Sequence, residues 1–271
     1  MFDLHVHSAP CLFPRRADDV TTVRWYEEAG CTGLVLKSHF EPTAGRAAAA
    51  GAGTRIEVYG SLVLNSHCGG LNPAAVEIAL GLGARVIWMP TFDARAGQHP
   101  ALRRPHEDAP LFAVPPVDET TEQACLRIFE LIAEADAVLA TGHLSTAEVG
   151  WLVPAAKRAG VTRILLTHPS FLVPAMTAAE TRELLELGTW AEITAWQLLH
   201  QEGCSAAVLA SFVRETDPAR IVLSTDSGQP NTPPGPEALA MLVAALVAEG
   251  LDPTAVEAMA SEIPRRLVAP A

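Results

Sequence analysis

The sequence is poor in basic residues. Its 19 lysines and arginines stand against 31 aspartates and glutamates, so the formal net charge is −12 at pH 7. Binding to nucleic acid or to an anionic membrane depends on clustered Lys and Arg, and an acidic protein is repelled by both. We therefore expect neither nucleic acid nor a membrane as a partner.

Cysteines and long apolar runs are also scarce. No apolar stretch of membrane-spanning length and no signal peptide can be recognised. The five cysteines show no C-x-x-C spacing, so we expect a reduced, cytoplasmic protein. They are Cys11, Cys31, Cys68, Cys125 and Cys204.

Aromatic residues are few, at 6% of the chain with only two tyrosines, which argues against sugars and large hydrophobic molecules as substrates. Aliphatic residues, in contrast, are abundant. The chain has 271 residues and is 49% hydrophobic, which is enough to fill the core of one α/β barrel domain.

Short β-branched runs alternate with Ala- and Glu-rich helical stretches, a pattern typical of parallel strands with crossover helices. Capping boxes at 145–148 and 177–180 mark two helix starts. We predict an α/β fold, a (β/α)8 TIM barrel in a single domain over residues 1–271. A doubly wound sheet is the alternative, but residues 8–11 are not the glycine-rich loop it usually carries. The eight strands are expected at 2–7, 33–37, 57–65, 85–89, 137–141, 163–167, 190–194 and 220–225.

One connection is much longer than the others. It spans about 92–122, after the fourth expected strand, and contains Pro, Arg and His. Loops of this length in a compact domain are usually functional or disordered. Because it follows a strand end, where a barrel has its active face, we predict a lid-like insertion.

Two histidines, one residue apart, lie at the end of the first expected strand. Positions i and i+2 of a strand point to the same face, so His5 and His7 project together while their neighbours face away. This arrangement presents two imidazoles to one metal ion.

Polar, metal-competent residues also follow other expected strands. Six of the nine histidines lie at or just beyond strand ends, where a barrel assembles its chemistry, whereas chance would scatter them over helices and loops. Beyond the first strand, the residues at strand ends are Lys37 and His39 (second strand), His67 (third), His143 (fifth), His168 (sixth) and Asp226 (eighth).

This ordered set resembles the amidohydrolase superfamily of metal-dependent barrel hydrolases. The resemblance rests on the paired His5 and His7, on His143 and His168 after strands five and six, and on Asp226 after strand eight. The tail at 259–268 is similar to the helix with which many members close. The resemblance covers essentially the whole chain.

The resemblance implies hydrolysis of a C–N, C–O or lactone bond in a small polar molecule. His5, His7 and Asp226 would hold Zn²⁺ or another divalent ion such as Mn²⁺, Fe²⁺ or Ni²⁺. His143 and His168 would hold a second ion or orient the hydrolytic water. A metal lowers the pKa of its water towards about 7, and Asp226 would take the proton as general base.

The fourth strand departs from the family pattern. Many members have a Glu or a carboxylated Lys there that bridges two ions, but residues 88–91 contain neither, and only Asp93 is nearby. We therefore expect one ion, with a bridge from a carboxylated Lys37 or from Glu192 as the alternative. A buried ammonium needs an anionic partner, a lowered pKa or carboxylation. We favour an uncarboxylated catalytic Lys37 that neutralises charge developing in the transition state.

Two other functions stay open. Residues 34–39 are similar to the second motif of phosphoesterases of the polymerase-and-histidinol-phosphatase (PHP) type, whose first motif is also His-x-His. Phosphoester hydrolysis is therefore the second candidate, and a catalytically silent barrel that binds a metal or ligand is the third. His39, His67 and Glu192 are candidate additional site residues, and packing or an ordinary ion pair explains each of them equally well.

Arginines in two loops indicate a small anionic substrate, since guanidinium groups suit carboxylate or phosphate. Arg15 and Arg16 follow the first strand and are the expected substrate-binding pair; solvated loop charges are the alternative. Arg95, Arg103 and Arg104 in the long connection add to them. A homo-oligomer stays open. We assign no role to His99, His106, His200 or Cys68.

Overall fold

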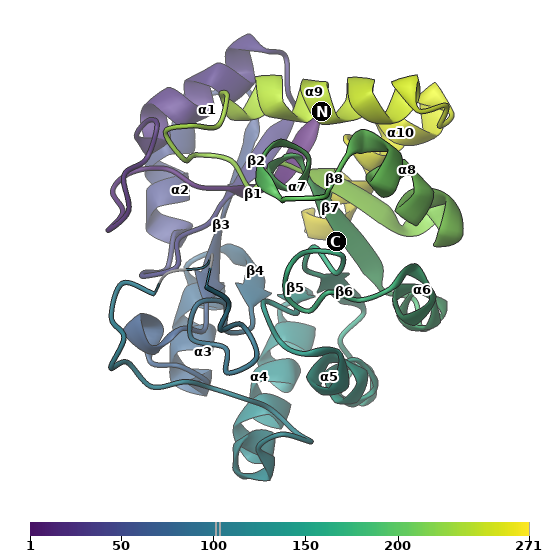
Figure 1. The fold of residues 1–271 in the computed structure, drawn as a ribbon. Helices are drawn as coiled ribbons and strands as arrows, with labels where there is room; N and C mark the ends of the chain where they lie inside the picture. Colours follow the sequence, from purple (N-terminus) through teal and green to yellow (C-terminus); the bar gives the residue numbers. More distant parts are fainter. Residues whose placement is uncertain (101, 103, 271) are drawn as a thin grey trace.

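The computed structural model describes residues 1–100, 102 and 104–270. Eight parallel strands form one sheet in the order β1 to β8, surrounded by helices (Figure 1). The predicted (β/α)8 TIM barrel is confirmed, and every strand boundary lies within two residues of its expected position. The strands are β1 Phe2–Val6, β2 Gly33–Leu36, β3 Glu57–Val63, β4 Ala84–Trp88, β5 Val138–Ala140, β6 Arg163–Leu166, β7 Trp190–Thr194 and β8 Ile221–Ser224.

Several helices begin where the sequence provides a capping side chain. Ser145 and Thr177 each form the predicted capping box with the Glu three residues later. None of the helices in the described part of the chain is long and apolar enough to cross a membrane. The helices are α1 Asp19–Glu28, α2 Ala44–Gly51, η1 Ser66–Cys68, α3 Pro73–Gly81, η2 Glu119–Thr121, α4 Glu122–Glu134, α5 Thr146–Arg158, α6 Ala178–Glu186, α7 Ala195–His200, α8 Ala206–Glu215, η3 Pro218–Arg220, α9 Gly235–Ala248, α10 Pro253–Met259 and α11 Glu262–Val268.

The first and last strands close the barrel. The backbone nitrogen of His7 donates to the carbonyl of Ser227 at 2.9 Å. The buried carboxylate of Asp3 accepts from the backbone nitrogen of Thr225 at 3.0 Å and from its hydroxyl at 2.7 Å. The Tyr26 hydroxyl of α1 also donates to Asp3. This carboxylate thereby links β1, β8 and α1 next to the predicted ligands.

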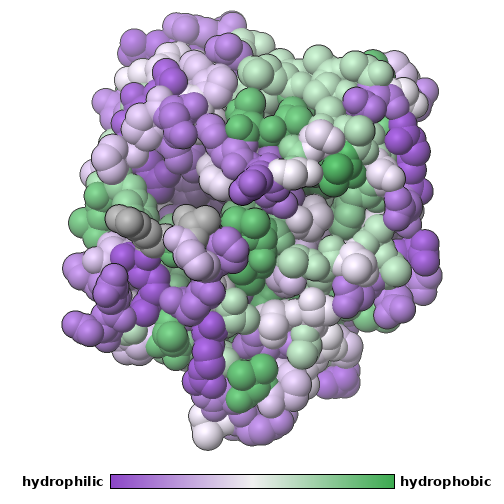
Figure 2. Space-filling view, in the orientation of Figure 1, coloured by the Kyte–Doolittle hydropathy of each residue, from purple (hydrophilic) through white to green (hydrophobic). Residues whose placement is uncertain are grey.

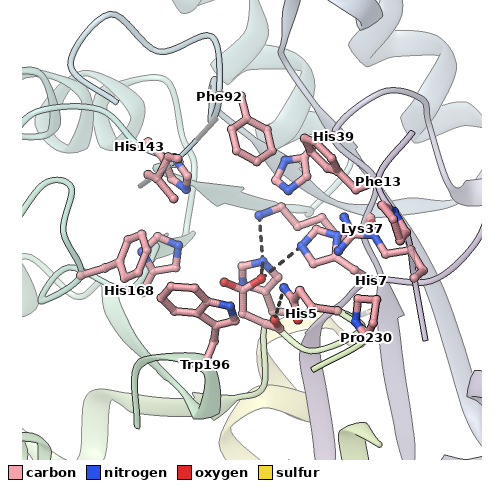
Figure 3. A pocket seen from close by; sticks show the side chains of 16 residues that line it. His5, His7, Phe13, Lys37, His39, Phe92, His143, His168, Trp196 and Pro230 are labelled. Carbon is pink, nitrogen blue, oxygen red and sulfur yellow. Dashed lines mark hydrogen bonds and ion pairs between the residues drawn. The ribbon is translucent and has the colours of Figure 1, made fainter. Parts of the chain in front are cut away.

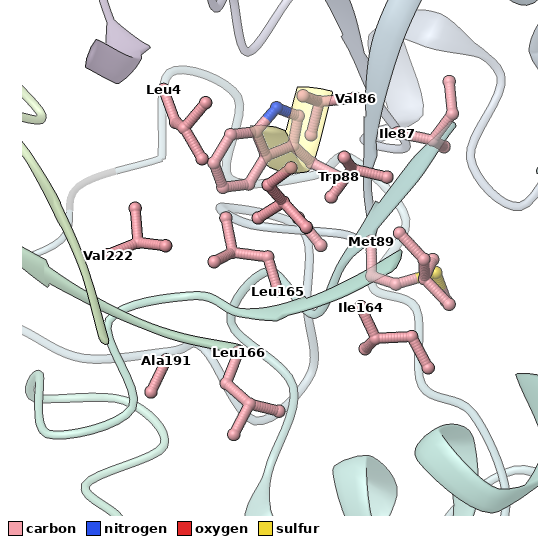
Figure 4. Packing of buried hydrophobic residues seen from close by; sticks show 14 of the residues in the cluster. Leu4, Val86, Ile87, Trp88, Met89, Ile164, Leu165, Leu166, Ala191 and Val222 are labelled. Atoms are coloured by element: carbon pink, nitrogen blue, oxygen red, sulfur yellow. The ribbon is translucent and has the colours of Figure 1, made fainter. Parts of the chain in front are cut away.

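Aliphatic side chains from most of the strands fill the core (Figure 4). Leu4, Trp88 and Leu165 are fully buried in this cluster. Val6 instead packs in a second cluster with Val23 of α1 and with residues of β2. Since side chains alternate along β1, the packing of Val6 on the helix side turns His5 and His7 to the other side of the strand.

The long connection after β4 is fastened by its own ion pairs. Arg104 donates to Asp93 at 2.8 Å, and Arg95 donates to Asp118 at 3.3 Å. These two arginines therefore have partners inside the connection. Arg103 lies outside the described residues, and the lid-like function of the segment stays a prediction.

Candidate metal centre

Three predicted ligands converge at the carboxyl ends of β1 and β8, and Figure 3 shows two of them, His5 and His7, in the pocket. Oδ1 of Asp226 lies 3.1 Å from Nε2 of His5 and 3.2 Å from Nε2 of His7. The ligand atoms all lie within 4.8 Å of one another, and across the described residues no other set of three His, Cys or acidic side chains does so. Such separations are those of donor atoms that share one small ion.

Hydrogen bonds on the far side of each ring orient these histidines. Nδ1 of His5 lies 3.0 Å from Oε1 of Glu192, and Nδ1 of His7 lies 3.0 Å from the carbonyl oxygen of Lys37. An ionised carboxylate and a carbonyl can only accept, so Nδ1 is the donor in both rings. Both Nε2 atoms therefore face Asp226, as in metal-ligating histidines whose second nitrogen is hydrogen-bonded.

The protonation states at the centre leave two hydrogen-bond acceptors, Nε2 of His7 and Oδ1 of Asp226, facing each other. Burial and the charge of Arg15 hold the pKa of His7 well below its ordinary value, so His7 is neutral. Burial would raise the pKa of Asp226, but His5 and His7 hold it well below its ordinary value. A neutral ring nitrogen and a carboxylate oxygen, 3.2 Å apart, have no proton to share. A cation satisfies both, and two imidazoles with one carboxylate suit Zn²⁺ and similar divalent ions.

Two site residues have left-handed backbone conformations. The φ angle is +50° at Asp226 and +26° at His168. Such conformations are costly for residues other than glycine and concentrate at functional sites. The chain after Asp226 also lies close to β1, because a Cβ at Gly228 would come within 1.9 Å of the carbonyl oxygen of His7.

Lys37 follows β2 and reaches into the centre (Figure 3). Its Nζ lies 2.8 Å from Nε2 of His5 and 4.0 Å from the ring centroid of Trp88. Burial lowers the pKa of Lys37 to about 8, although Asp226 and Glu192 oppose this effect. As an ammonium, Lys37 donates a hydrogen bond to Nε2 of His5. A metal ion bound at this Nε2 has to displace the Lys37 ammonium.

His143 and His168 lie on the opposite side of the pocket from His7 (Figure 3). Their ring centroids are 5.2 Å apart. Burial lowers the pKa of His168 to about 4 and that of His143 well below its ordinary value. Neither ring forms a hydrogen bond within the described part of the chain, and both Nδ1 atoms are buried. They present neutral imidazoles beside the three-ligand set.

Glu192, the carboxylate considered as a bridge, and Asp93, the carboxylate that follows β4, both lie outside the pocket. Glu192 is fully buried behind His5, where it also accepts from the hydroxyl of Ser224 at 2.5 Å and from the backbone nitrogen of His168 at 3.2 Å. Asp93 is held by Arg104 and by the hydroxyl of Ser66 at 2.6 Å. Neither Glu192 nor Asp93 lines the pocket.

The two other candidate histidines differ. The ring of His39 lines the pocket and stacks on His7, with 4.7 Å between centroids. His67 lies at the rim, where its Nδ1 is 3.9 Å from Asp93, and it does not line the pocket. Only His39 therefore joins the site. Cys68 is a half-buried thiol whose pKa burial raises to about 12, which makes it a poor nucleophile.

A hydrogen-bond chain sets the tautomer of His39. The side-chain oxygen of Asn65 accepts from the backbone nitrogen of Thr91 at 2.9 Å, so the amide nitrogen is the atom that donates to Oγ1 of Thr91, also at 2.9 Å. Nδ1 of His39 lies 2.9 Å from the same Thr91 hydroxyl. Within the described chain it is the one acceptor to which this hydroxyl can donate. His39 therefore carries its proton on Nε2. The sequence offered no signal for Asn65 and Thr91 beyond their positions after β3 and β4.

The pocket around these residues has a volume of about 330 Å³. Figure 2 shows a hollow on this face with hydrophilic residues inside it and hydrophobic groups on its border. Its lining includes Phe13, Phe92, Phe171 and Trp196, although the sequence as a whole is poor in aromatic residues. The expectation against sugars and large hydrophobic molecules rested on a scarcity of aromatic residues, and the lining of the pocket does not share that scarcity.

The two predicted substrate-binding arginines are separated. Arg15 lines the pocket. Arg16 instead donates to the carbonyl oxygens of Thr232 at 2.5 Å and Pro230 at 3.0 Å. It fastens the loop after β8 and does not line the pocket.

Comparisons with known proteins agree with this architecture. A model of DUF6282, a family of unknown function, matches residues 1–192. No curated protein sequence matches the chain. Similar solved structures include a lactonase from Listeria monocytogenes, at 10% identity and TM-score 0.65, with 98% of this chain and 94% of that chain covered. An amidohydrolase from Pseudomonas aeruginosa has 11% identity and TM-score 0.64, with 98% and 95% covered.

A mutant of a lactonase from Deinococcus radiodurans that resembles phosphotriesterase (PTE-like) has 15% identity and TM-score 0.62, with 92% of this chain and 85% of that chain covered. At these identities the likeness establishes the fold. The predicted barrel fold is thereby confirmed over nearly the whole chain.

Proposed function

Since the chain belongs to DUF6282, a family of unknown function, we propose its activity from its own residues: a hydrolase that depends on one divalent ion held by His5, His7 and Asp226. The reaction would cleave a C–N, C–O or lactone bond of a small molecule. The proposal rests on the two Nε2 atoms that face one oxygen of Asp226, 3.1 and 3.2 Å away, with no proton between that oxygen and His7.

A divalent ion at this position supplies Lewis acidity, which makes water nucleophilic at neutral pH and polarises the bond under attack. The ionised Asp226 lines the pocket and accepts the proton of the attacking water at its carboxylate. His143 and His168 are neutral and their rings have no hydrogen-bond partner among the described residues, so they are placed to hold that water by hydrogen bonds.

Two further groups face the reacting atoms. Lys37 brings a cationic donor to the centre and, once displaced from His5, would neutralise negative charge that develops on the substrate. The tautomer of His39 leaves its Nε2–H for the pocket, where it would donate a hydrogen bond to the substrate atom on which the negative charge develops. Both act as electrostatic groups that need no proton transfer.

The similar folds favour this reaction class. Two of the similar structures are lactonases and one is an amidohydrolase, and a site at the carboxyl ends of the strands is where barrels of this kind carry out catalysis. The phosphoesterase alternative, a homo-oligomeric state and a cytoplasmic location stay predictions.

Elemental analysis of protein purified without chelator tests the proposal. We expect about one divalent ion per chain, because one set of three ligands is present in the described residues. Asp226→Asn should lose most of this metal and remain folded, since Asn tolerates the left-handed backbone that position 226 requires. Asp93→Asn, which removes a carboxylate outside the pocket, should retain it.

Equal metal content in Asp226→Asn and in the unchanged protein would show that the ligand assignment is wrong. Two tightly bound ions per chain, located by anomalous scattering, would refute the single-ion centre. A panel of lactones, amides and phosphate monoesters then separates the leading reaction from phosphoester hydrolysis.

A further inference from the structure

Arg15 lies in the pocket without a partner. It forms no ion pair and no side-chain hydrogen bond with any residue in the described part of the chain, and its Nε is buried. This is unusual in a chain with 31 acidic residues and 19 basic ones. A buried guanidinium nitrogen without an acceptor is unfavourable, and a bound anion would supply that acceptor.

The neighbouring Arg16 provides the contrast. It donates to two backbone carbonyls of the loop after β8, and it does not line the pocket. Two consecutive arginines thus have separate tasks: Arg16 holds a loop, and Arg15 leaves its donors to the pocket.

Two aromatic pairs line the same pocket, and Figure 3 shows Phe92 and Trp196, one member of each pair, on opposite sides of it. Phe13 and Phe92 contact each other edge to face with 5.5 Å between ring centroids. Phe171 and Trp196 do the same at 5.2 Å. The rings place apolar surface next to the candidate metal centre. This surface is in unfavourable contact with water when no ligand is bound. A ligand with a flat apolar group would cover this surface.

We propose that this pocket recognises a carboxylate bound by Arg15 together with an aromatic or similarly flat apolar group packed between the two aromatic pairs. The substrate of the proposed hydrolase would then be an aromatic carboxylic acid with a hydrolysable bond, and this identification rests on the proposed function. A single guanidinium fork matches one carboxylate. The second nearby cation, Lys37, faces the candidate metal centre, where the proposed function assigns it to charge that develops during the reaction, so Arg15 is the cation left for the substrate's own anionic group. A volume of about 330 Å³ suits a small one-ring molecule.

Calorimetric titration with three probes tests this recognition directly. Phenylacetate carries both features, phenylacetamide lacks the charge, and acetate lacks the ring. We expect phenylacetate to bind about 10- to 100-fold more tightly than either of the others, the range for a charged hydrogen-bonded contact. Arg15→Gln should abolish the preference for phenylacetate over phenylacetamide. Arg16→Gln is the matched control and should retain it.

A carboxylate could also bind to a metal ion, so the titrations are repeated after removal of metal by a chelator. Binding of phenylacetate that persists without metal and disappears in Arg15→Gln supports the proposal. Binding that requires metal and is unaffected by Arg15→Gln overturns it, as does equal binding of phenylacetate and phenylacetamide. Metal content is measured on the same samples, so failure of this recognition is distinguished from failure of the metal centre.

Discussion

Replacing Glu192 by glutamine should weaken divalent-ion binding at the proposed centre by about 10- to 100-fold, or about 1.4–2.8 kcal/mol. Glu192 does not face the ion. It accepts from Nδ1 of His5 at 3.0 Å and thereby keeps Nε2 of that ring unprotonated and directed at Asp226. A neutral amide oxygen accepts a weaker hydrogen bond, so His5 becomes a poorer ligand and its orientation is less firmly set.

The same substitution has a calculable cost in stability. Glutamine has one acceptor oxygen, and if that oxygen keeps the contacts with His5 and Ser224, its NH₂ group faces the backbone N–H of His168. A buried N–H without an acceptor costs about 1–3 kcal/mol. For a chain of this size, this corresponds to a fall in Tm of about 2–12 °C.

The affinity is measured by competition with a chelating indicator well below Tm, so that only folded protein is compared. Glu148→Gln is the matched control. Glu148 is also buried and accepts from backbone nitrogens, those of Val114 and Ser145, but it does not line the pocket. It should lose stability and keep the metal affinity. An unchanged dissociation constant in Glu192→Gln would refute the reasoning that the carboxylate prepares His5 as a ligand.

Two further predictions concern buried polar contacts. Lys37→Met should leave metal affinity unchanged or raise it while kcat falls, because an N–H leaves the metal-facing atom of His5; lower metal content that short carboxylic acids restore would instead indicate a carboxylated ligand. Tyr26→Phe should lower the free energy of unfolding by about 1.5–3 kcal/mol at pH 7.5 and by about 0.5–1.5 kcal/mol at pH 5. Burial raises the pKa of Asp3 to about 6 and the Tyr26 hydrogen bond opposes this rise, so the hydroxyl stabilises mainly the carboxylate present above pH 6. Urea denaturation at both pH values checks this, with Tyr59→Phe as the half-buried control; an equal loss at both would contradict the assigned charge.

The sequence was sufficient to predict the barrel and the convergence of His5, His7 and Asp226 at one end of it. Strand order in a barrel follows chain order, and alternation along β1 places His5 and His7 on one face. Asp226 could be added because the carboxyl ends of all strands meet at one face of a barrel. The placement of these residues uses only local periodicity and topology, whereas their role as ligands was an implication of the family resemblance.

The remaining features depend on side chains that meet across loops. Phe13, Phe92 and Phe171 come from three irregular connections and Trp196 from the short helix α7, so a low overall aromatic content concealed a local concentration. Arg15 and Arg16 are identical in type and adjacent, and only the loop geometry separates them. The partner of Lys37 could not be predicted either, because its contact with His5 depends on the exact reach of one side chain.

The seam between β1 and β8 also has a consequence for how the protein is made. It joins Asp3 to Thr225, which are 222 positions apart in the chain. At about 5–20 residues per second on the ribosome, the paired histidines emerge roughly 10–45 s before the aspartate that would complete their site. Ion capture through all three groups is therefore coupled to the last step of barrel closure, and a nascent or truncated chain that lacks β8 carries both histidines without the carboxylate needed to retain an ion.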